Sequence, residues 1–141
     1  MAKSFDIAVV LGSFHKKESE IMLKAAEAAA KQRDLVIRYI VRVPGSYEKP
    51  LAVKRLMRRP DIDGVVVMGI IERGETAHGR VMGQTVSDAI VQLQLEFMKP
   101  VGFGIIGPEV QPSQIAPRLE PHAVAAVEAL SVMLRYEEPP H

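Results

Sequence analysis

The chain has 141 residues and a formal net charge of +1, with 48% hydrophobic and 25% charged residues. A chain of this length fits one domain, so we treat residues 1–141 as a single unit that buries roughly two-thirds of its unfolded surface. The near-neutral charge gives no basic excess for a phosphate backbone, and the sequence therefore predicts no nucleic-acid partner. The lack of cysteine excludes disulfides, thiolate nucleophiles and cysteine-bound metals.

The first residues, MAKSFDIAVVLG, contain only a short apolar run behind one lysine. That run is too short for the core of a secretory signal peptide or for a transmembrane helix. Because cysteines are also lacking, we expect a cytoplasmic protein with no membrane partner.

Apolar runs rich in valine and isoleucine alternate with helical patterns along the chain. The predicted strands are residues 7–11, 36–43, 64–70 and 101–106, and the predicted helices are residues 19–33, 47–59, 79–98 and the segment that starts near Glu120. Continuous rather than alternating apolarity is typical of strands that are buried on both faces of a parallel sheet. This order predicts an α/β fold with a doubly wound, flavodoxin-like sheet of four parallel strands, in the order 2-1-3-4, with helices on both faces.

The helix predicted at residues 79–98 carries more apolar surface than one contact with a sheet would use. One stripe at helical spacing can face the sheet, and Val91, Leu95 and Met98 lie off that stripe. A subunit interface would cover these side chains, although scattered exposed apolar residues also occur in monomers. The pattern favours a homo-oligomer.

In a doubly wound sheet, ligands bind beyond the carboxyl ends of the strands at the point where the winding reverses. With the order 2-1-3-4 this point lies between the first and third strands, so the loops that begin at Gly12 and Ile71 should border the site. Phe14 follows the first strand, where its ring could stack on a heteroaromatic ligand or lie under the next helix. The loop has neither G-x-G-x-x-G nor the Walker pattern, which argues against a nucleotide-binding loop.

The turn VPGSYEKP at residues 43–50 follows the second predicted strand. Pro44 and Gly45 shape the turn, and Ser46 could cap the next helix. Glu48 lies in the first helical turn, where its carboxylate could compensate the helix dipole or accept hydrogen bonds from a polyol or an amine.

The segment GIIERGETAH at residues 69–78 runs from a buried strand through a glycine to the start of a helix. Backbone N–H groups at residues 74–76 and the Thr76 hydroxyl could bind a phosphate, with His78 nearby as a proton donor or acceptor. Alternatively, Thr76 is a simple cap and His78 a surface residue. The histidines lack metal-ligand spacing and the chain has no G-x-S-x-G elbow, so we predict neither a metal site nor a serine hydrolase.

Together these motifs resemble those of the lumazine synthase family along nearly the whole chain. The family has an aromatic residue after the first strand, matched by Phe14, and a V-P-G-[AS]-[FY]-E-x-P turn, matched by residues 43–50. Its G-x-x-x-R-G-x-T-x-H segment is matched by residues 69–78, its P-V-x-F-G strand by residues 100–104, and its arginine before the last helix by Arg118.

The resemblance implies a transferase without cofactor or metal that condenses an amino-ribitylamino-pyrimidinedione with dihydroxybutanone phosphate. The products are dimethyl-ribityllumazine, a precursor of riboflavin, together with inorganic phosphate and water. The resemblance also implies a homo-oligomer, either a pentamer or an icosahedral capsid of twelve pentamers, in which neighbouring subunits complete each site.

The resemblance further assigns roles to individual residues. His78 is the expected catalytic residue, which moves protons between the reacting groups. The substrate contacts expected within one subunit are Phe14 for ring stacking, Ser46, Tyr47 and Glu48 for the ribityl chain, the main chain at Ile70 and Ile71 for the ring edge, and Gly74, Glu75 and Thr76 for the phosphate. Phe103 and Arg118 are expected to reach the site from a neighbouring subunit.

Three features depart from the family pattern. His15 stands where asparagine is frequent, Glu72 stands where an apolar residue is frequent, and residues 122–126 lack the basic residue usual early in the last helix. We hypothesise that His15 replaces the hydrogen bond of the asparagine. The alternatives to the synthase are a catalytically weak shell protein that binds flavin or lumazine, and an archaeal-type riboflavin synthase, against which the RGETAH segment argues.

Overall fold

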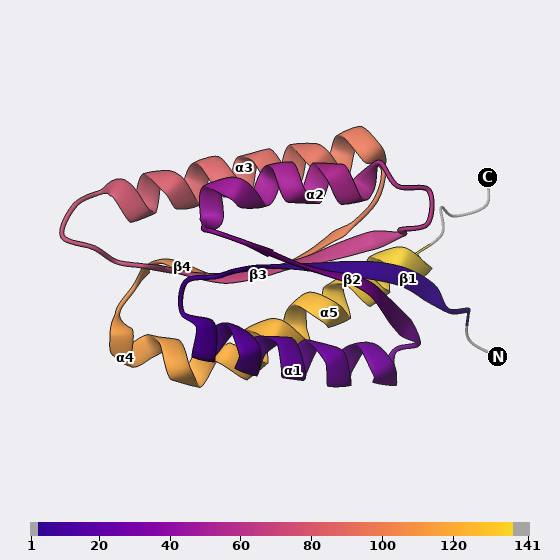
Figure 1. The fold of residues 1–141 in the computed structure, drawn as a ribbon, viewed down its shortest axis with the longest axis horizontal. Coiled ribbons are helices and arrows are strands. Elements are labelled where there is room, and N and C mark those ends of the chain that lie inside the picture. The colour runs from indigo at the N-terminus through magenta and orange to yellow at the C-terminus, as the bar shows by residue number, and fades with distance from the viewer. Residues whose placement is uncertain (1–2, 137–141) are drawn as a thin grey trace.

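The computed structural model describes residues 3–136, in which four parallel strands form one sheet in the order β2-β1-β3-β4 (Figure 1). The strands are β1 (Phe5–Gly12), β2 (Leu35–Val43), β3 (Gly64–Glu72) and β4 (Val101–Val110). The helices are α1 (Lys16–Gln32), α2 (Lys49–Met57), α3 (His78–Phe97), α4 (Pro112–Ile115) and α5 (Leu119–Arg135), with 3-10 turns η1 (Ser46–Glu48) and η2 (Ala116–Arg118). The predicted doubly wound, flavodoxin-like fold with the order 2-1-3-4 is confirmed.

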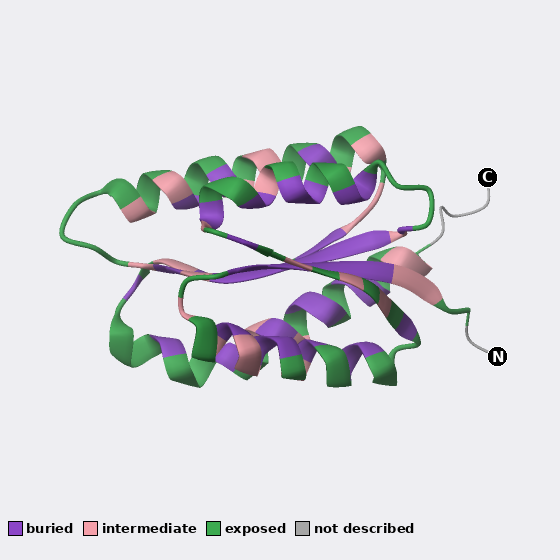
Figure 2. Ribbon diagram, viewed as in Figure 1, coloured by how far each residue is buried: buried purple, intermediate pink, exposed green. Residues whose placement is uncertain are grey.

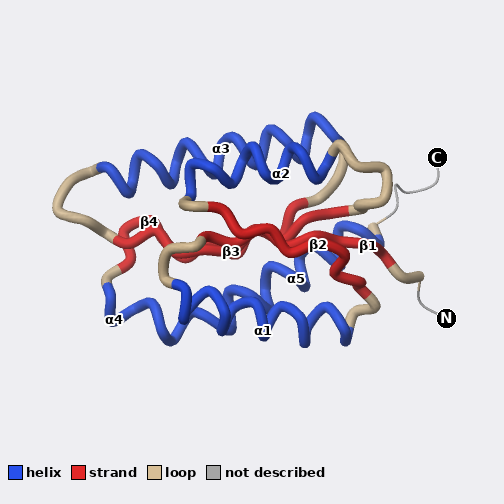
Figure 3. The backbone as a smooth tube through the Cα atoms, viewed as in Figure 1, coloured by secondary structure: helices blue, strands red, loops and turns tan. Residues whose placement is uncertain are grey.

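The sheet lies between two helical layers. Helices α2 and α3 cover one face and α1 and α5 cover the other, an arrangement that Figure 3 shows as a red sheet between blue layers. Ile7, Val9 and Leu11 of β1 belong to the apolar cluster on the α1 and α5 side, whereas Ala8 and Val10 belong to the cluster under α2 and α3. Figure 2 shows the central strands buried and the outer surfaces of the helices exposed. Burial on both faces explains why the apolar runs of β1 and β3 are continuous.

The edge strand β2 differs from the expectation of a continuously buried strand. Its side chains alternate between exposed and partly buried from Val36 to Arg42. The strand pairs with β1 alone, so it has a neighbour on one side only. The prediction of burial on both faces is therefore wrong for this strand, although its position in the sheet is as predicted.

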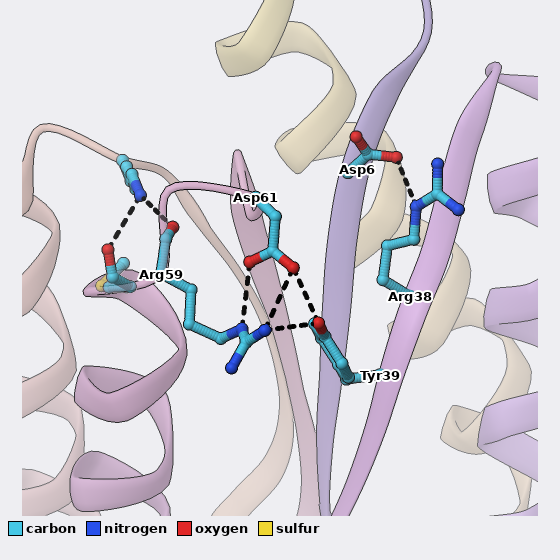
Figure 4. A network of polar contacts seen from close by, with 7 residues as sticks. Asp6, Arg38, Tyr39, Arg59 and Asp61 are labelled. Carbon is cyan, nitrogen blue, oxygen red and sulfur yellow. Dashed lines mark hydrogen bonds and ion pairs between the residues drawn. The ribbon is translucent and has the colours of Figure 1, made fainter.

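A polar network joins β2 to the loop between α2 and β3 (Figure 4). Arg59 Nε donates to Asp61 Oδ1 at 3.0 Å, Arg59 Nη2 donates to the Tyr39 hydroxyl at 2.6 Å, and that hydroxyl donates to Asp61 Oδ2 at 2.7 Å. The hydrogen bond to Asp61 raises the pKa of Tyr39, and hydrogen bonds from Arg59 and Tyr39 lower the pKa of Asp61. Because these groups face solvent, the network fixes the path of the loop more than it adds to stability.

The second apolar stripe on α3 is exposed in the single chain. Val91 and Leu95 have exposed side chains, and Met98 just beyond the helix is 81% exposed. The stripe is thus available for a contact with another surface, as the helical pattern indicated. Within the described residues, no helix is both long and apolar enough to cross a membrane.

Helix α5 lies close over β4 because Gly102 has no side chain. A Cβ atom built on Gly102 would overlap the carbonyl oxygen of Ala126 and would lie 2.9 Å from its carbonyl carbon. The obstacle is backbone, which cannot rotate away as a flexible side chain can. Gly102 is therefore a requirement of the packing between α5 and the sheet.

Replacing Gly102 with alanine should lower the free energy of unfolding by roughly 1 to 3 kcal/mol or more, because overpacking against backbone forces the elements apart. Gly74→Ala is the matched control, since a Cβ there meets nothing within 4 Å. Urea unfolding of both variants measures the difference, and equal stability of the two would contradict the close approach of α5 to β4.

Candidate functional site

A cleft of about 460 Å³ lies at the carboxyl ends of the central strands, where the winding reverses between β1 and β3. Its walls come from the loops after β1, β2 and β3 and from the first turn of α3. In Figure 1 this end of the sheet lies at the left, where the loop from β3 to α3 extends beyond the strands. The prediction that the loops beginning at Gly12 and Ile71 border one cavity is confirmed.

The structure brings most of the expected site residues to this cleft. Those that line it are Phe14, Ser46, Tyr47, Glu48, Ile70, Ile71, Gly74, Thr76 and His78. Glu75 is exposed in the same loop but does not line the cleft. Phe103 and Arg118 also lie outside it, on β4 and in η2, and both are exposed.

Phe14 presents its ring to the open side of the cleft. The residue is 72% exposed, and a Cβ atom on Gly45 would lie 3.4 Å from Phe14 Cε2. The ring thus rests against the turn after β2 and is not covered by the helix that follows it. Of the two alternatives, burial under the next helix is wrong, and the exposed ring is available for stacking.

The turn after β2 carries hydroxyl and carboxylate groups to the cleft. Ser46 is buried and its hydroxyl oxygen accepts a hydrogen bond from Lys49 Nζ at 3.3 Å. No side-chain cap is formed at the start of η1 or α2, so the prediction that Ser46 caps the helix is wrong. Tyr47 and Glu48 are exposed at the rim, and the Tyr47 ring meets the His78 ring edge-on with 6.0 Å between centroids.

The loop between β3 and α3 is open to solvent and ends at the N-terminus of a 20-residue helix. The Thr76 hydroxyl oxygen accepts a hydrogen bond from the backbone N–H of His78 at 3.3 Å. A hydroxyl that accepts in this way still has its own proton to donate to a ligand. The backbone N–H of Arg73 donates a hydrogen bond to the backbone carbonyl of Val110 at 2.8 Å, which holds the start of the loop against the end of β4. The loop therefore lies at the N-terminus of a long helix, where the helix dipole favours negative charge.

Two departures from the family pattern meet at the cleft. His15 Nε2 lies 3.4 Å from Glu72 Oε1, and both side chains are partly exposed and line the cleft. His15 also has a left-handed backbone, with a φ of 55°. Histidine and asparagine are among the residues most enriched in this conformation, which gives a backbone reason for the exchange. His15 and Glu72 thus contact each other and connect the loop after β1 with the end of β3.

Lys49 is a site residue that the sequence analysis missed. Its side chain is 1% exposed, yet it lines the cleft. A Cβ atom on Gly69 would overlap its Nζ, and a Cβ atom on Gly12 would lie 3.7 Å from it. The amine therefore occupies the space left by Gly12 at the end of β1 and by Gly69 within β3. Burial lowers the pKa of Lys49 to about 8, with partial opposition from the negative charge of Glu48.

The signal for this lysine is its place in the helical repeat. Lys49 precedes Ala52, Val53 and Leu56 by three, four and seven residues, and all three are buried. These spacings place it on the face of α2 that contacts the sheet. A lysine on an apolar face is unusual, and that position could have been identified from the sequence.

Replacing Lys49 with methionine should raise the free energy of unfolding at pH 7 by up to about 3 kcal/mol. Burial lowers the pKa of the lysine from 10.5 to about 8, and each pKa unit corresponds to about 1.4 kcal/mol. Below a pH of about 8 the lysine is charged in both states and the cost of burial is fully present. As the pH rises from about 8 toward 10.5, the unfolded chain binds more protons and the folded state gains stability.

Urea unfolding at pH 7 and pH 10 checks this prediction. The advantage of Lys49→Met over the unaltered protein should shrink at the higher pH. Lys54→Met, on the exposed side of the same helix, serves as the control and should show no such change. An advantage of Lys49→Met that is the same at both pH values would contradict the burial of a charged amine.

Comparison with known proteins gives consistent matches over most of the chain. The model of the family described as 6,7-dimethyl-8-ribityllumazine synthase matches residues 4–138. A protein of that name from Metallosphaera sedula is 39% identical over 132 residues, which cover 94% of this chain and 87% of the relative. A protein of the same name from Staphylothermus marinus is 38% identical over 128 residues, which cover 91% and 85%.

A solved structure of a short-chain flavodoxin associated with a non-canonical PDU bacterial microcompartment gives a TM-score of 0.44 at 11% identity, covering 89% of this chain and 99% of that one.

Proposed function

The chain belongs to the 6,7-dimethyl-8-ribityllumazine synthase family, and we propose that the cleft between β1 and β3 is where it makes its lumazine product. The reaction condenses amino-ribitylamino-pyrimidinedione with dihydroxybutanone phosphate in riboflavin biosynthesis. The observation that carries the proposal is that one cleft is lined by the exposed ring of Phe14, by residues 45–48 of the VPGSYE turn, and by Gly74, Thr76 and His78 of the RGETAH segment, which lie far apart in the sequence. The family matches favour this enzyme over a riboflavin synthase or a silent shell protein.

The pyrimidinedione half of the reaction fits the side of the cleft between the loops after β1 and β2. Phe14 offers an exposed ring face on which the heterocycle stacks. Ser46, Tyr47 and Glu48 supply hydroxyl and carboxylate groups, which are the partners that a ribityl chain of hydroxyls needs. The main chain at Ile70 and Ile71 lies at the end of β3, where its polar groups can meet the edge of the ring.

The phosphate of the second substrate fits the loop before α3. Gly74, Glu75 and Thr76 precede a long helix, whose N-terminal dipole and backbone N–H groups favour an anion. A Cβ on Gly74 would meet nothing within 4 Å, so the loop leaves room for a ligand. Glu75 contributes through its backbone, because its carboxylate would repel the phosphate.

The reaction needs proton transfers but no redox step. The amine of the pyrimidinedione adds to the ketone, and loss of water gives an imine. Removal of the proton from the neighbouring carbinol carbon expels phosphate and gives an enol, which tautomerises to a second ketone. The second nitrogen adds to that ketone, and loss of a second water closes the ring. His78 lies at the start of α3, beside Tyr47 and next to the phosphate loop, where an imidazole can give and take these protons. Holding both substrates in one cleft supplies much of the remaining rate enhancement.

We also propose that each site is completed by a neighbouring subunit, in a pentamer or in a capsid of twelve pentamers. Phe103 and Arg118 carry expected substrate contacts, yet both are exposed and lie outside the cleft of their own chain. Arg118 instead lines a separate hollow and donates to the Gln114 carbonyl at 2.8 Å. The exposed stripe Val91, Leu95 and Met98 offers apolar surface for such an assembly.

Replacing His78 with alanine should slow lumazine formation by roughly 100-fold or more without abolishing it, because general acid–base catalysis contributes about 10²–10⁴-fold and substrate positioning remains. The absorbance of the lumazine product measures the rate, with an enzyme-free reaction as the control for uncatalysed condensation. Loss of all turnover above that control in a folded variant would contradict this division of roles, and an unchanged rate would remove His78 from the mechanism.

Mixing two variants of reduced activity tests the shared site. Arg118→Ala and His78→Ala subunits, dissociated and reassembled together, should recover activity above the sum of the two parents. Recovery is expected because the Arg118→Ala subunit keeps His78 and the His78→Ala subunit keeps Arg118. Where the two are neighbours, the cleft of the first can receive the arginine of the second, and that site has both native residues. If Arg118 served the cleft of its own chain, every site would keep one defect and no recovery would be seen.

A further inference from the structure

Lys49 is a buried charged group for which the condensation described above has no use. Its ammonium carries three N–H donors. Among the hydrogen bonds of residues 3–136, it makes one, to Ser46 Oγ at 3.3 Å. A buried charge with so few partners is costly, and a charged group of this kind in a cleft is a candidate for contact with a ligand.

The ammonium lies beside two strands and next to the cleft. The backbone at Gly12 and Gly69 lies near Nζ, and Ser46 Oγ accepts a hydrogen bond from it. Lys49 also lines the cleft, although it is almost fully buried. A ligand that fills the cleft would therefore lie against this residue.

The position of the ammonium indicates which substrate it meets. Gly69 immediately precedes Ile70 and Ile71, and Ser46 belongs to the turn proposed to hold the ribityl chain. Both neighbours thus belong to the side of the cleft that we assign to the pyrimidinedione. In the phosphate loop, by contrast, a Cβ atom built on Gly74 has no atom of Lys49 within 4 Å.

An ammonium in this place requires an oxygen acceptor. The ring carbonyl oxygens of a pyrimidinedione carry partial negative charge and have lone pairs to accept hydrogen bonds. We propose that Lys49 contacts the substrate and donates a hydrogen bond to a carbonyl oxygen of the pyrimidinedione ring, an assignment that rests on the proposed function. The contact would neutralise part of the cost of burying the charge, because a charged donor gains a partner when the cleft is filled.

The test compares Lys49→Met with the unaltered protein. Methionine keeps much of the length of the side chain and removes its charge and donors. Lys54→Met is the matched control, because Lys54 lies on the exposed side of α2 and pairs at the surface with Glu96 at 3.9 Å. Fluorescence titration with 6,7-dimethyl-8-ribityllumazine, which retains the ring carbonyls and the ribityl chain, gives a dissociation constant that does not depend on turnover.

Lys49→Met should weaken lumazine binding by about ten-fold or more, the effect typical of losing a hydrogen bond from a charged group. The KM for the pyrimidinedione should rise by a similar factor, whereas the KM for dihydroxybutanone phosphate should stay unchanged. Lys54→Met should bind as the unaltered protein does. Gly69→Ala provides a second variant, because its methyl group would displace Nζ while the charge remains, and it should also weaken lumazine binding.

The outcomes separate this inference from the proposed function. Unchanged lumazine binding by Lys49→Met, with normal turnover by the unaltered protein, would overturn the role of Lys49 alone. An equal rise in KM for both substrates would overturn its assignment to the pyrimidinedione. Weakened binding by Lys49→Met in a protein that forms no lumazine would support the contact and overturn the proposed synthase activity. A protein that neither binds nor makes lumazine would overturn both.

Discussion

The parallel pairing of β1 with β3 at the centre of the sheet determines where the site lies and what it contains. The register of the two strands runs from Ile7 beside Gly64 to Leu11 beside Met68, so the next residues, Gly12 at the end of β1 and Gly69 within β3, follow the last paired residues. Because neither glycine has a side chain, a gap remains beside the two strands, and Lys49 Nζ lies in it. The chain also turns to opposite faces after these strands, so the loops separate above the gap and the cleft opens there.

Lys49 places a charged amine in the gap beside Gly12 and Gly69, next to the cleft. Helix α2 presents its inner face to the sheet, and its first residue reaches the glycine gap from that face. An apolar side chain would fill the gap at less cost in stability, since burial lowers the pKa of the lysine to about 8. The fold thus carries a destabilising charge at the position where the pyrimidinedione is proposed to bind. Lys49 brings a cation to the cleft from within one subunit.

Much of this arrangement could be predicted from the sequence, because it depends on local patterns. Continuous apolar runs identify β1 and β3, and the rule for doubly wound sheets then places the site at the loops after Gly12 and Ile71. Features that depend on tertiary context were missed or mistaken. The apolar run of β2 predicted burial on both faces although the predicted order placed this strand at an edge, and the contact of His15 with Glu72 depends on the paths of two segments far apart in the sequence. The places of Phe103 and Arg118 in a site would require a second subunit, which no pattern within one chain describes.

The most direct test of the account is a crystal structure of the protein with 6,7-dimethyl-8-ribityllumazine bound. We expect the ring in the cleft between β1 and β3, stacked on Phe14, with the ribityl chain along Ser46 and Glu48. We also expect a ring carbonyl oxygen within hydrogen-bond distance of Lys49 Nζ. A lumazine bound at another surface, with this cleft filled only by water, would show that the reaction site lies elsewhere.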